Sequence, residues 1–330
     1  MYQLRVLSAL IFTCIAFVGI AAALKASDLT QTHVMVADAS TSAADHQQAP
    51  RIDESFFATT TAQTQTGSST ELAQSAALAL AVAPAAPIDP VTASAYVVGD
   101  IMTGKIYLEK KGKEVLPFAS MSKLITAIAS TDKYKPDDVI TITASSTEVP
   151  PDASNLQTGE RFTAHELLYP MLMDSSNVAA EALASATDRV AFLQDMTGYA
   201  WEIGMPGSYF ADPTGLSPAN SGTAEGFFAM AQYLYKSRPD ILAITRIKTI
   251  SVATTTDHGA HIFANIHPFV DDLRFLGGKT GHTDEALDTM LTIMQIDGHP
   301  IAIIVLHSYN RRALDTSLLI DRVTNILAGE

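Results

Sequence analysis

The apolar residues of the chain fall into three zones with different patterns. Val6 to Leu24 is an unbroken run of apolar and small residues with a basic residue on each side, long enough for a helix to cross the roughly 30 Å hydrocarbon core of a bilayer. From 27 to 92 no period of 2 or 3.6 is sustained, so neither strands nor helices are indicated. Periodic patterns return after that point. We therefore expect a segment 1–26, a linker 27–92 and a folded domain 93–330.

The first segment is typical of a membrane anchor or of a secretory signal. A signal usually has a shorter apolar core and a cleavage site between small residues, and Ala21-Ala22-Ala23 offers such a site. With either interpretation the rest of the chain leaves the cytoplasm. The linker is rich in Ala, Thr, Ser, Gln and Pro; as a flexible coil it spans on the order of 45 Å, which would hold the domain away from a membrane surface.

The domain begins and ends with strand patterns and has helical patterns between them. Strands are predicted over 95–100 and 105–109, and the spacing of apolar residues predicts a helix over 121–129. Most of 164–236 is helical by the same test, except for the Pro- and Gly-containing loop 210–217. Further strands are predicted over 247–254 and 260–266, with a turn at 257–259.

The last part of the chain has the clearest pattern. Strands over 291–296 and 300–307 enclose Asp297-Gly298, a favoured hairpin turn. A final amphipathic helix follows over 312–327. Its expected buried positions are Leu314, Leu318, Leu319, Val323 and Leu327. The fold class is therefore α/β, with a mixed, largely antiparallel sheet covered by helices and a helical insertion.

Composition and charge exclude several kinds of function. The formal net charge is −14, and no basic stripe with interleaved aromatic residues is present, so we expect no binding to nucleic acid. The single cysteine, Cys14, lies in the first apolar run and cannot form an intrachain disulfide. The nine histidines lack metal-ligand spacing. We expect neither a metal site nor a cofactor.

Three short strings carry the candidate chemistry. The first is Ser120-Met121-Ser122-Lys123 at the start of a predicted helix. Serine needs a base at neutral pH, and a residue three positions further along a helix lies on the same face. Lys123 is so placed, and burial beside a second cation such as Lys279 would lower its pKa and favour the neutral amine.

The second and third strings supply groups that can position a substrate. In Ser175-Ser176-Asn177, Ser175 can relay a proton and Asn177 can hold Lys123 or a peptide amide, whereas Ser176 is expected to be structural. Lys279-Thr280-Gly281 is predicted to be an edge strand.

On that strand, Lys279 and Thr280 can bind a carboxylate, and Gly281 lets a substrate backbone approach closely. The N–H groups of His282 and Ser120 would form an oxyanion hole, without a role for the His282 side chain.

Two further strings serve as internal controls. Ser130-Thr131-Asp132-Lys133 repeats the spacing of the first motif, and Ser308-Tyr309-Asn310 repeats that of the second. The former lies at the far end of its helix, and the latter follows the Lys-Thr-Gly string. We therefore expect neither to belong to the site, and the order and setting of the motifs carry the prediction.

The domain resembles the serine-type D-alanyl-D-alanine carboxypeptidases, the low-molecular-mass penicillin-binding proteins with a β-lactamase/transpeptidase-like fold. Five blocks carry the resemblance: 118–124, 167–169, 177–180, 212–216 and 278–283. It implies that Ser120 is acylated, that Lys123 is its base, and that Ser175, Asn177 and Lys279 to Gly281 complete the site. Ser176 and Leu287 stand where that family often has glycine.

The resemblance implies a hydrolase that removes the terminal D-alanine of peptidoglycan stem peptides in the cell envelope, with β-lactams as covalent inhibitors. An endopeptidase that cuts cross-links would use the same residues. A β-lactamase should carry a Glu in a string such as E-x-x-L-N after the second motif, and none is found. A catalytically silent penicillin-binding protein is the remaining alternative. The N-terminal segment would connect the enzyme to the membrane.

Overall fold

The computed structural model describes residues 89–150 and 152–329. The predicted anchor or signal segment and most of the predicted linker lie outside this range. Within it, no helix has both the length and the apolar character needed to cross a membrane. Residues 89–92, expected to be linker, pack onto the domain: Val91 is buried, and the Thr92 side chain donates to Asp315 Oδ2 at 2.8 Å.

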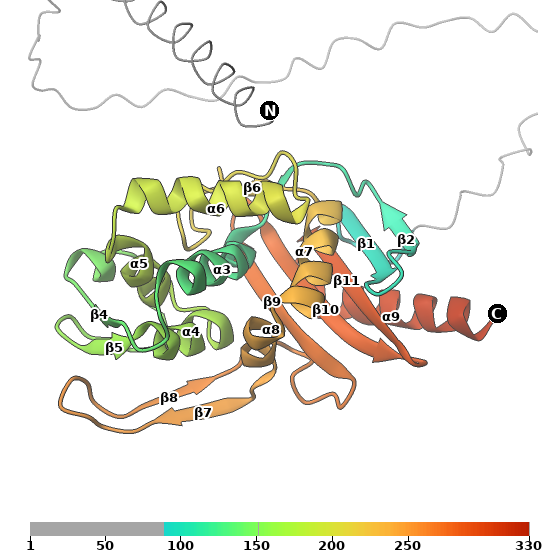
Figure 1. The fold of residues 1–330 in the computed structure, drawn as a ribbon. Helices are drawn as coiled ribbons and strands as arrows, with labels where there is room; N and C mark the ends of the chain where they lie inside the picture. Colours follow the sequence, from blue (N-terminus) through green and yellow to red (C-terminus); the bar gives the residue numbers. More distant parts are fainter. Residues whose placement is uncertain (1–88, 151, 330) are drawn as a thin grey trace, which may run out of the picture. The chain divides into compact units, whose positions relative to one another are not determined.

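A five-stranded sheet forms the centre of the described chain, in the order β2-β1-β11-β10-β9 (Figure 1). Its strands are β1 (Ala95–Asp100), β2 (Ile106–Lys110), β9 (Phe275–Thr283), β10 (Leu287–Ile296) and β11 (His299–Ser308). Each neighbouring pair is antiparallel, so the sheet is antiparallel throughout rather than mixed.

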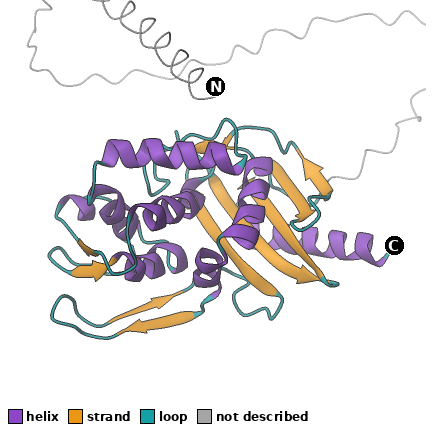
Figure 2. Cartoon of the chain, in the orientation of Figure 1, coloured by secondary structure: helices purple, strands orange, loops and turns teal. Residues whose placement is uncertain are grey.

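Both faces of the sheet are buried, because helices cover each of them (Figure 2). On β1, Val97 points into the core shared with the main group of helices, whereas Tyr96 and Val98 point into a second core beneath α9 (Arg312–Ala328). Such double burial explains why the inner strands β1 and β11 are nearly continuous apolar runs instead of alternating patterns.

The main group of helices follows the chain from the first motif to the last strands. It comprises α3 (Lys123–Lys133), α4 (Ala164–Met173), α5 (Asn177–Ser185), α6 (Arg189–Ile203), α7 (Ala224–Ser237) and α8 (Pro239–Arg246). Short 3-10 turns are η1 (Ala119–Ser122) and η2 (Ser145–Thr147). Three small antiparallel sheets lie around them: β3 (Leu116–Pro117) with β6 (Ser221–Gly222), β4 (Val139–Thr141) with β5 (Arg161–Thr163), and β7 (Thr249–Val252) with β8 (His261–Ala264).

Most predicted elements are confirmed to within a few residues. The C-terminal hairpin, β1, β2, the helices between 164 and 236 and the loop 210–217 all occur. Helix α8 has no counterpart among the predicted elements. In α9, Leu319 and Val323 are buried and Leu318 and Leu327 partly so, but the prediction for Leu314 was wrong: it is exposed, because it lies on the side of the first turn that faces away from the sheet.

Both α4 and α5 begin with a side-chain cap, and the second motif lies between the end of α4 and the start of α5. Thr163 and Glu166 form a capping box at the start of α4. At the start of α5, the Ser176 side chain accepts a hydrogen bond from the backbone N–H of Ala179 at 3.1 Å. The chain turns between Met173, the last residue of α4, and the capped start of α5, and Ser175 lies at that turn with φ of 70°.

Candidate active site

Ser120 lies in the 3-10 turn η1, which runs directly into α3. The prediction that Ser120 lies at the start of a helix is confirmed, and the α-helical part of that helix begins at Lys123. The preceding residue, Ala119, has φ of 50°, a left-handed conformation that costs a non-glycine residue on the order of 1 kcal/mol or more. Phe118 holds the turn in place, because its buried ring packs edge-on against Phe227 at 5.0 Å between centroids.

Lys123 connects the first motif to two other parts of the chain. Its Nζ donates to Ser120 Oγ at 2.9 Å, to Asn177 Oδ1 at 2.8 Å and to the Thr214 carbonyl at 2.6 Å. The side chain is fully buried, and this burial lowers the pKa of Lys123 to about 7, although the anions of Asp212, Asp152 and Asp174 oppose the shift. A substantial fraction of neutral amine at pH 7 is what a general base requires.

The second motif lies at the N-terminus of α5. Asn177 is the first residue of that helix and orients Lys123, as predicted. Ser175 is partly exposed, and its Oγ accepts a hydrogen bond from Lys279 Nζ at 2.8 Å. Ser176 caps the helix, in agreement with the structural role expected for it.

The third motif lies on β9, which is an edge strand as predicted. Lys279 is buried and also donates to the Thr280 carbonyl at 2.9 Å. Burial and the nearby cations of Lys123 and Arg312 lower its pKa well below the usual value. At Gly281, a Cβ atom would lie 3.0 Å from the Ser120 nitrogen and 2.9 Å from the Phe118 carbonyl oxygen. Only glycine therefore allows β9 to pass so close to Ser120.

The remaining predicted residues lie further along the same strand. Thr280 is buried at 3 % exposure. The His282 ring is half-exposed, and its Nδ1 lies 3.0 Å from Asp288 Oδ1. The structure thus brings all eight predicted site residues to one place: Ser120, Lys123, Ser175, Asn177, Lys279, Thr280, Gly281 and His282.

Sequence reasoning missed Arg312, which lies at the start of α9. Its Nη1 donates to the Gly281 carbonyl at 2.8 Å and to Asp288 Oδ1 at 2.9 Å. A guanidinium group thus stands beside the third motif and adds positive charge there. No local pattern marks this residue, because the contact joins two elements that are separated by a hairpin.

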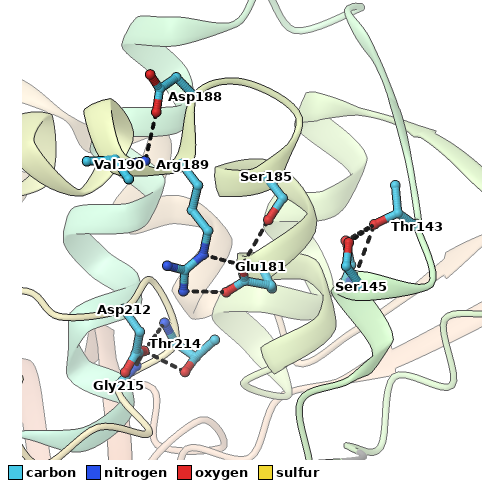
Figure 3. A network of polar contacts seen from close by, with 11 residues as sticks. Thr143, Ser145, Glu181, Ser185, Asp188, Arg189, Val190, Asp212, Thr214 and Gly215 are labelled. Carbon is cyan, nitrogen blue, oxygen red and sulfur yellow. Dashed lines mark hydrogen bonds and ion pairs between the residues drawn. The ribbon is translucent and has the colours of Figure 1, made fainter.

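Two partly buried aspartates that sequence reasoning did not assign hold the loops around Lys123. Asp212 accepts from the backbone N–H groups of Thr214, Gly215 and Ser217, each at 2.7 Å. Figure 3 shows Asp212 beside Thr214 and Gly215. Burial opposes ionisation of Asp212, but these bonds outweigh it and lower its pKa. The bonds aim the Thr214 carbonyl at Lys123. Asp152 Oδ2 accepts from the backbone N–H groups of Asn177 and Val178 and from Ser176 Oγ.

Gly215 is as constrained as Gly281. Its φ is 88°, and a Cβ atom there would lie only 2.0 Å from the Ala119 carbonyl oxygen. The loop therefore packs directly behind η1. Figure 3 also shows the ion pair between Arg189 and Glu181, which joins the start of α6 to α5 near the Asp212 loop.

Both control strings lie outside the site, as predicted. Ser130 Oγ donates to the Thr126 carbonyl at 2.7 Å, and Lys133 is exposed at the far end of α3. Ser308 Oγ donates to Asp315 Oδ2 at 2.7 Å, and Asn310 is exposed. Among the residues that the structure describes, no group of three or more His, Cys, Asp or Glu side chains is arranged to hold a metal ion.

The fold, and the placement of Ser120 Oγ 2.9 Å from the amine of Lys123, agree with comparisons to known proteins. The chain belongs to the D-alanyl-D-alanine carboxypeptidase family, whose model matches residues 60–310. It is therefore a serine peptidase of the penicillin-binding protein class.

Relatives with related activities are 23% and 29% identical to this chain over the aligned residues. A D-alanyl-D-alanine endopeptidase of Pseudomonas aeruginosa is 29% identical over 222 residues, which cover 65% of this chain and 71% of that protein. A D-alanyl-D-alanine carboxypeptidase of Mycobacterium tuberculosis is 23% identical over 226 residues, or 67% of this chain and 77% of that protein.

Solved structures show the same fold. The Streptomyces K15 DD-transpeptidase superposes with a TM-score of 0.65 at 20% identity, covering 72% of this chain and 98% of that one. Penicillin-binding protein D2 of Listeria monocytogenes, in its ampicillin-bound form, gives a TM-score of 0.61 at 25% identity, again with 72% and 98% coverage.

Proposed function

We propose that Ser120 of this enzyme is acylated by the terminal D-alanyl-D-alanine of peptidoglycan stem peptides, and that terminal D-alanine is released. One observation carries the proposal: Ser120 Oγ is partly exposed and lies 2.9 Å from the Nζ of a buried lysine. A nucleophile hydrogen-bonded to a base, with that base oriented by a third group, is the arrangement that nucleophilic catalysis requires. Asn177 is the orienting group.

The proposed acylation uses the neutral form of Lys123. Its amine takes the proton from Ser120 as Oγ bonds to the carbonyl carbon of the penultimate D-alanine. The oxygen of that carbonyl becomes negative and accepts hydrogen bonds from the N–H groups of Ser120 and His282. Gly281 supports this placement, because it brings β9 against the Ser120 nitrogen.

The second half of the reaction releases D-alanine and restores the serine. Ser175, hydrogen-bonded to Lys279, donates a proton to the leaving nitrogen as the C–N bond breaks, and it is reprotonated at the expense of the Lys123 ammonium, which becomes neutral again. Water then attacks the Ser120 ester and gives a proton to neutral Lys123. Lys123 returns that proton to Ser120 Oγ as the C–O bond breaks, and the shortened peptide leaves with a new carboxylate. Lys279 and Thr280 bind the carboxylate of the substrate's terminal D-alanine, since charge-assisted hydrogen bonds to an anion are strong.

Digestion of purified peptidoglycan by the full chain tests this function. We expect free D-alanine from pentapeptide stems, detected by mass spectrometry, with cross-linked dimers left intact. The Ser120→Ala variant serves as the control for contaminating activity. Loss of cross-linked dimers without free D-alanine would contradict the carboxypeptidase activity.

That contrary outcome would identify the second candidate function, a DD-endopeptidase that cuts cross-links. The observation in its favour is that three relatives named as endopeptidases are 27% to 31% identical to this chain, while three relatives named as carboxypeptidases are 23% to 28% identical. The catalytic residues would be the same in both functions, so only the products distinguish them.

Arg312→Ala is expected to raise KM for a D-alanyl-D-alanine peptide by about tenfold with a smaller change in kcat. Its guanidinium adds positive charge beside Gly281, and loss of a charge-assisted contact costs on the order of 1.5 kcal/mol or more. Steady-state kinetics measure both constants. Arg311→Ala removes the same charge from the exposed neighbouring position and should leave KM unchanged; an equal rise in both variants would contradict the assignment.

We also propose that the enzyme acts in the cell envelope, outside the cytoplasm, and that residues 1–26 direct it there. The family's peptidoglycan substrate supports this location, as does the apolar run from Val6 to Leu24. β-Lactams would acylate Ser120 in the same way as the peptide, as suggested by the ampicillin-bound form of the Listeria protein.

A further inference from the structure

One buried carboxyl group at the site has no role in the reaction described above. Asp174 follows α4 and directly precedes Ser175. It is buried at 9 % exposure, and its Oδ1 is shielded from solvent without a hydrogen-bond partner among the described residues. An unpaired buried polar atom is costly, so its presence beside Ser175 calls for a functional reason.

The other two aspartates near Lys123 differ from Asp174 in this respect. Asp212 and Asp152 each accept several backbone N–H groups, which spread and compensate their negative charge. The backbone N–H of Ser176 favours the ionised form of Asp174, but the Oδ1 atom of Asp174 has no partner among the described residues. Its charge, when present, therefore acts more directly on neighbouring ionisable groups.

Those neighbours come from three elements packed around the α4–α5 junction. Lys279 on β9 reaches the junction through its 2.8 Å bond to Ser175 Oγ, Lys123 comes from α3, and Asp152 lies in the loop before β5. The segment after β8 packs on Met173 and contributes His267, a neutral group because burial lowers its pKa to about 3.

The two lysines need opposite charge states in the proposed reaction. Lys123 must be neutral to accept a proton, whereas Lys279 must be cationic to bind a carboxylate. Both are fully buried and lie close enough to repel each other. The carboxylate that favours the charged form of Lys279 is Asp174, whereas Lys123 is influenced more strongly by Asp212 and Asp152 than by Asp174.

We propose that Asp174 is a positioning residue that keeps Lys279 protonated while Lys123 loses its proton. The inference rests on the proposed function and deepens it. The ionised carboxylate stabilises the nearby ammonium of Lys279, so that the one remaining cation of the pair stays on the strand that binds the substrate. Burial and the Asp152 anion raise the pKa of Asp174 to about 7, against the opposing effect of Lys279, so its charge develops in the range where Lys123 becomes neutral.

Because the Asp174 carboxylate favours the charged form of Lys279, the direction of the change expected in Asp174→Asn is determined. Without the anion, the pKa of Lys279 falls further, and Lys279 loses its proton at lower pH. The alkaline limb of a bell-shaped rate profile reports the group that must stay protonated. We therefore expect this limb to move to lower pH by about one unit, while the acid limb, set by Lys123, moves less.

The experiment is the pH dependence of acylation by a fluorescent penicillin, measured for the full-length wild type and Asp174→Asn from about pH 5 to about pH 10. Asp195→Asn removes the same charge from an exposed position on α6 and should leave both limbs in place. A lower rate with unmoved limbs would show a merely structural role and overturn the proposal. An equal shift in Asp195→Asn would overturn it too.

A second measurement does not depend on activity or on folding of the variant. The ¹³C NMR spectrum of wild-type protein labelled at aspartate carboxyls should contain one resonance that titrates near pH 7, the value to which burial raises the pKa of Asp174. Absence of any such aspartate would overturn the proposal. Failure of the wild type to react with penicillin at every pH would instead contradict the proposed function of Ser120.

Discussion

Replacing Ser120 with alanine is expected to abolish covalent labelling by a fluorescent penicillin. The change removes the one oxygen that lies 2.9 Å from Lys123 Nζ and leaves no nucleophile for an acyl-enzyme. Loss of a catalytic nucleophile lowers turnover by factors on the order of 10⁶, which is far below detection in a gel assay. The measurement is the intensity of the labelled band after denaturation, since only a covalent adduct survives.

The chain itself offers a matched control for this experiment. Ser130→Ala makes the same substitution in a string with the same spacing, but Ser130 only donates to the Thr126 carbonyl. We expect full labelling and a loss of stability of about 1 kcal/mol, the usual contribution of one hydrogen bond. A labelled band that persists in Ser120→Ala would show that another residue is acylated.

The features that could be predicted from the sequence are determined by interactions between residues close together along the chain. The hairpin of β10 and β11 turns at Asp297 and Gly298, whose φ values are 48° and 82°, and such left-handed pairs are encoded by the turn residues themselves. Ser120 and Lys123 are three residues apart along consecutive helical turns, so helix geometry alone places them together. The order of the motifs separated them from the control strings.

What the sequence could not predict depends on contacts between distant segments. Arg312 lies beside Gly281 only because α9 returns to the edge of the sheet, and Asp152 caps α5 from a loop that precedes β5. Neither residue has a neighbour in sequence that indicates this role. The strained conformation of Ala119 is likewise imposed by the packing of Gly215 and Gly281 against the turn.

Contacts between distant segments also explain why helix α8 was not predicted and why the burial predicted for Leu314 was wrong. Helix α8 is short, begins with Pro239 and is stabilised by packing of Ile241 and Leu242 into the main core, so its local propensity gives little signal. Leu314 fits the apolar stripe of α9 by spacing, but it is exposed in the first turn of the helix. Both outcomes are decided by tertiary contacts.

Replacing Lys123 with methionine is expected to lower the rate of acylation by a factor of about 10³, within the usual contribution of a general base. Methionine retains much of the apolar stem but cannot accept the proton of Ser120. Stopped-flow measurement with a chromogenic β-lactam gives the rate. Lys133→Met is the control, because Lys133 is exposed at the other end of α3 and should acylate at the wild-type rate.

The same variant should also change how stability depends on pH. Burial lowers the pKa of Lys123 from 10.5 to about 7, so between these values the unfolded chain binds the proton more readily than the folded protein. By linkage, the penalty for burying the charge is complete below about pH 7 and disappears as the pH rises to 10.5. Lys123→Met lacks this penalty. As the pH falls from 10.5 to 7, the wild type should therefore lose a few kcal/mol, roughly, of unfolding free energy relative to Lys123→Met. Urea denaturation at several pH values measures this difference. If the difference between the two proteins does not change with pH, Lys123 stays charged in the folded enzyme and cannot act as its base.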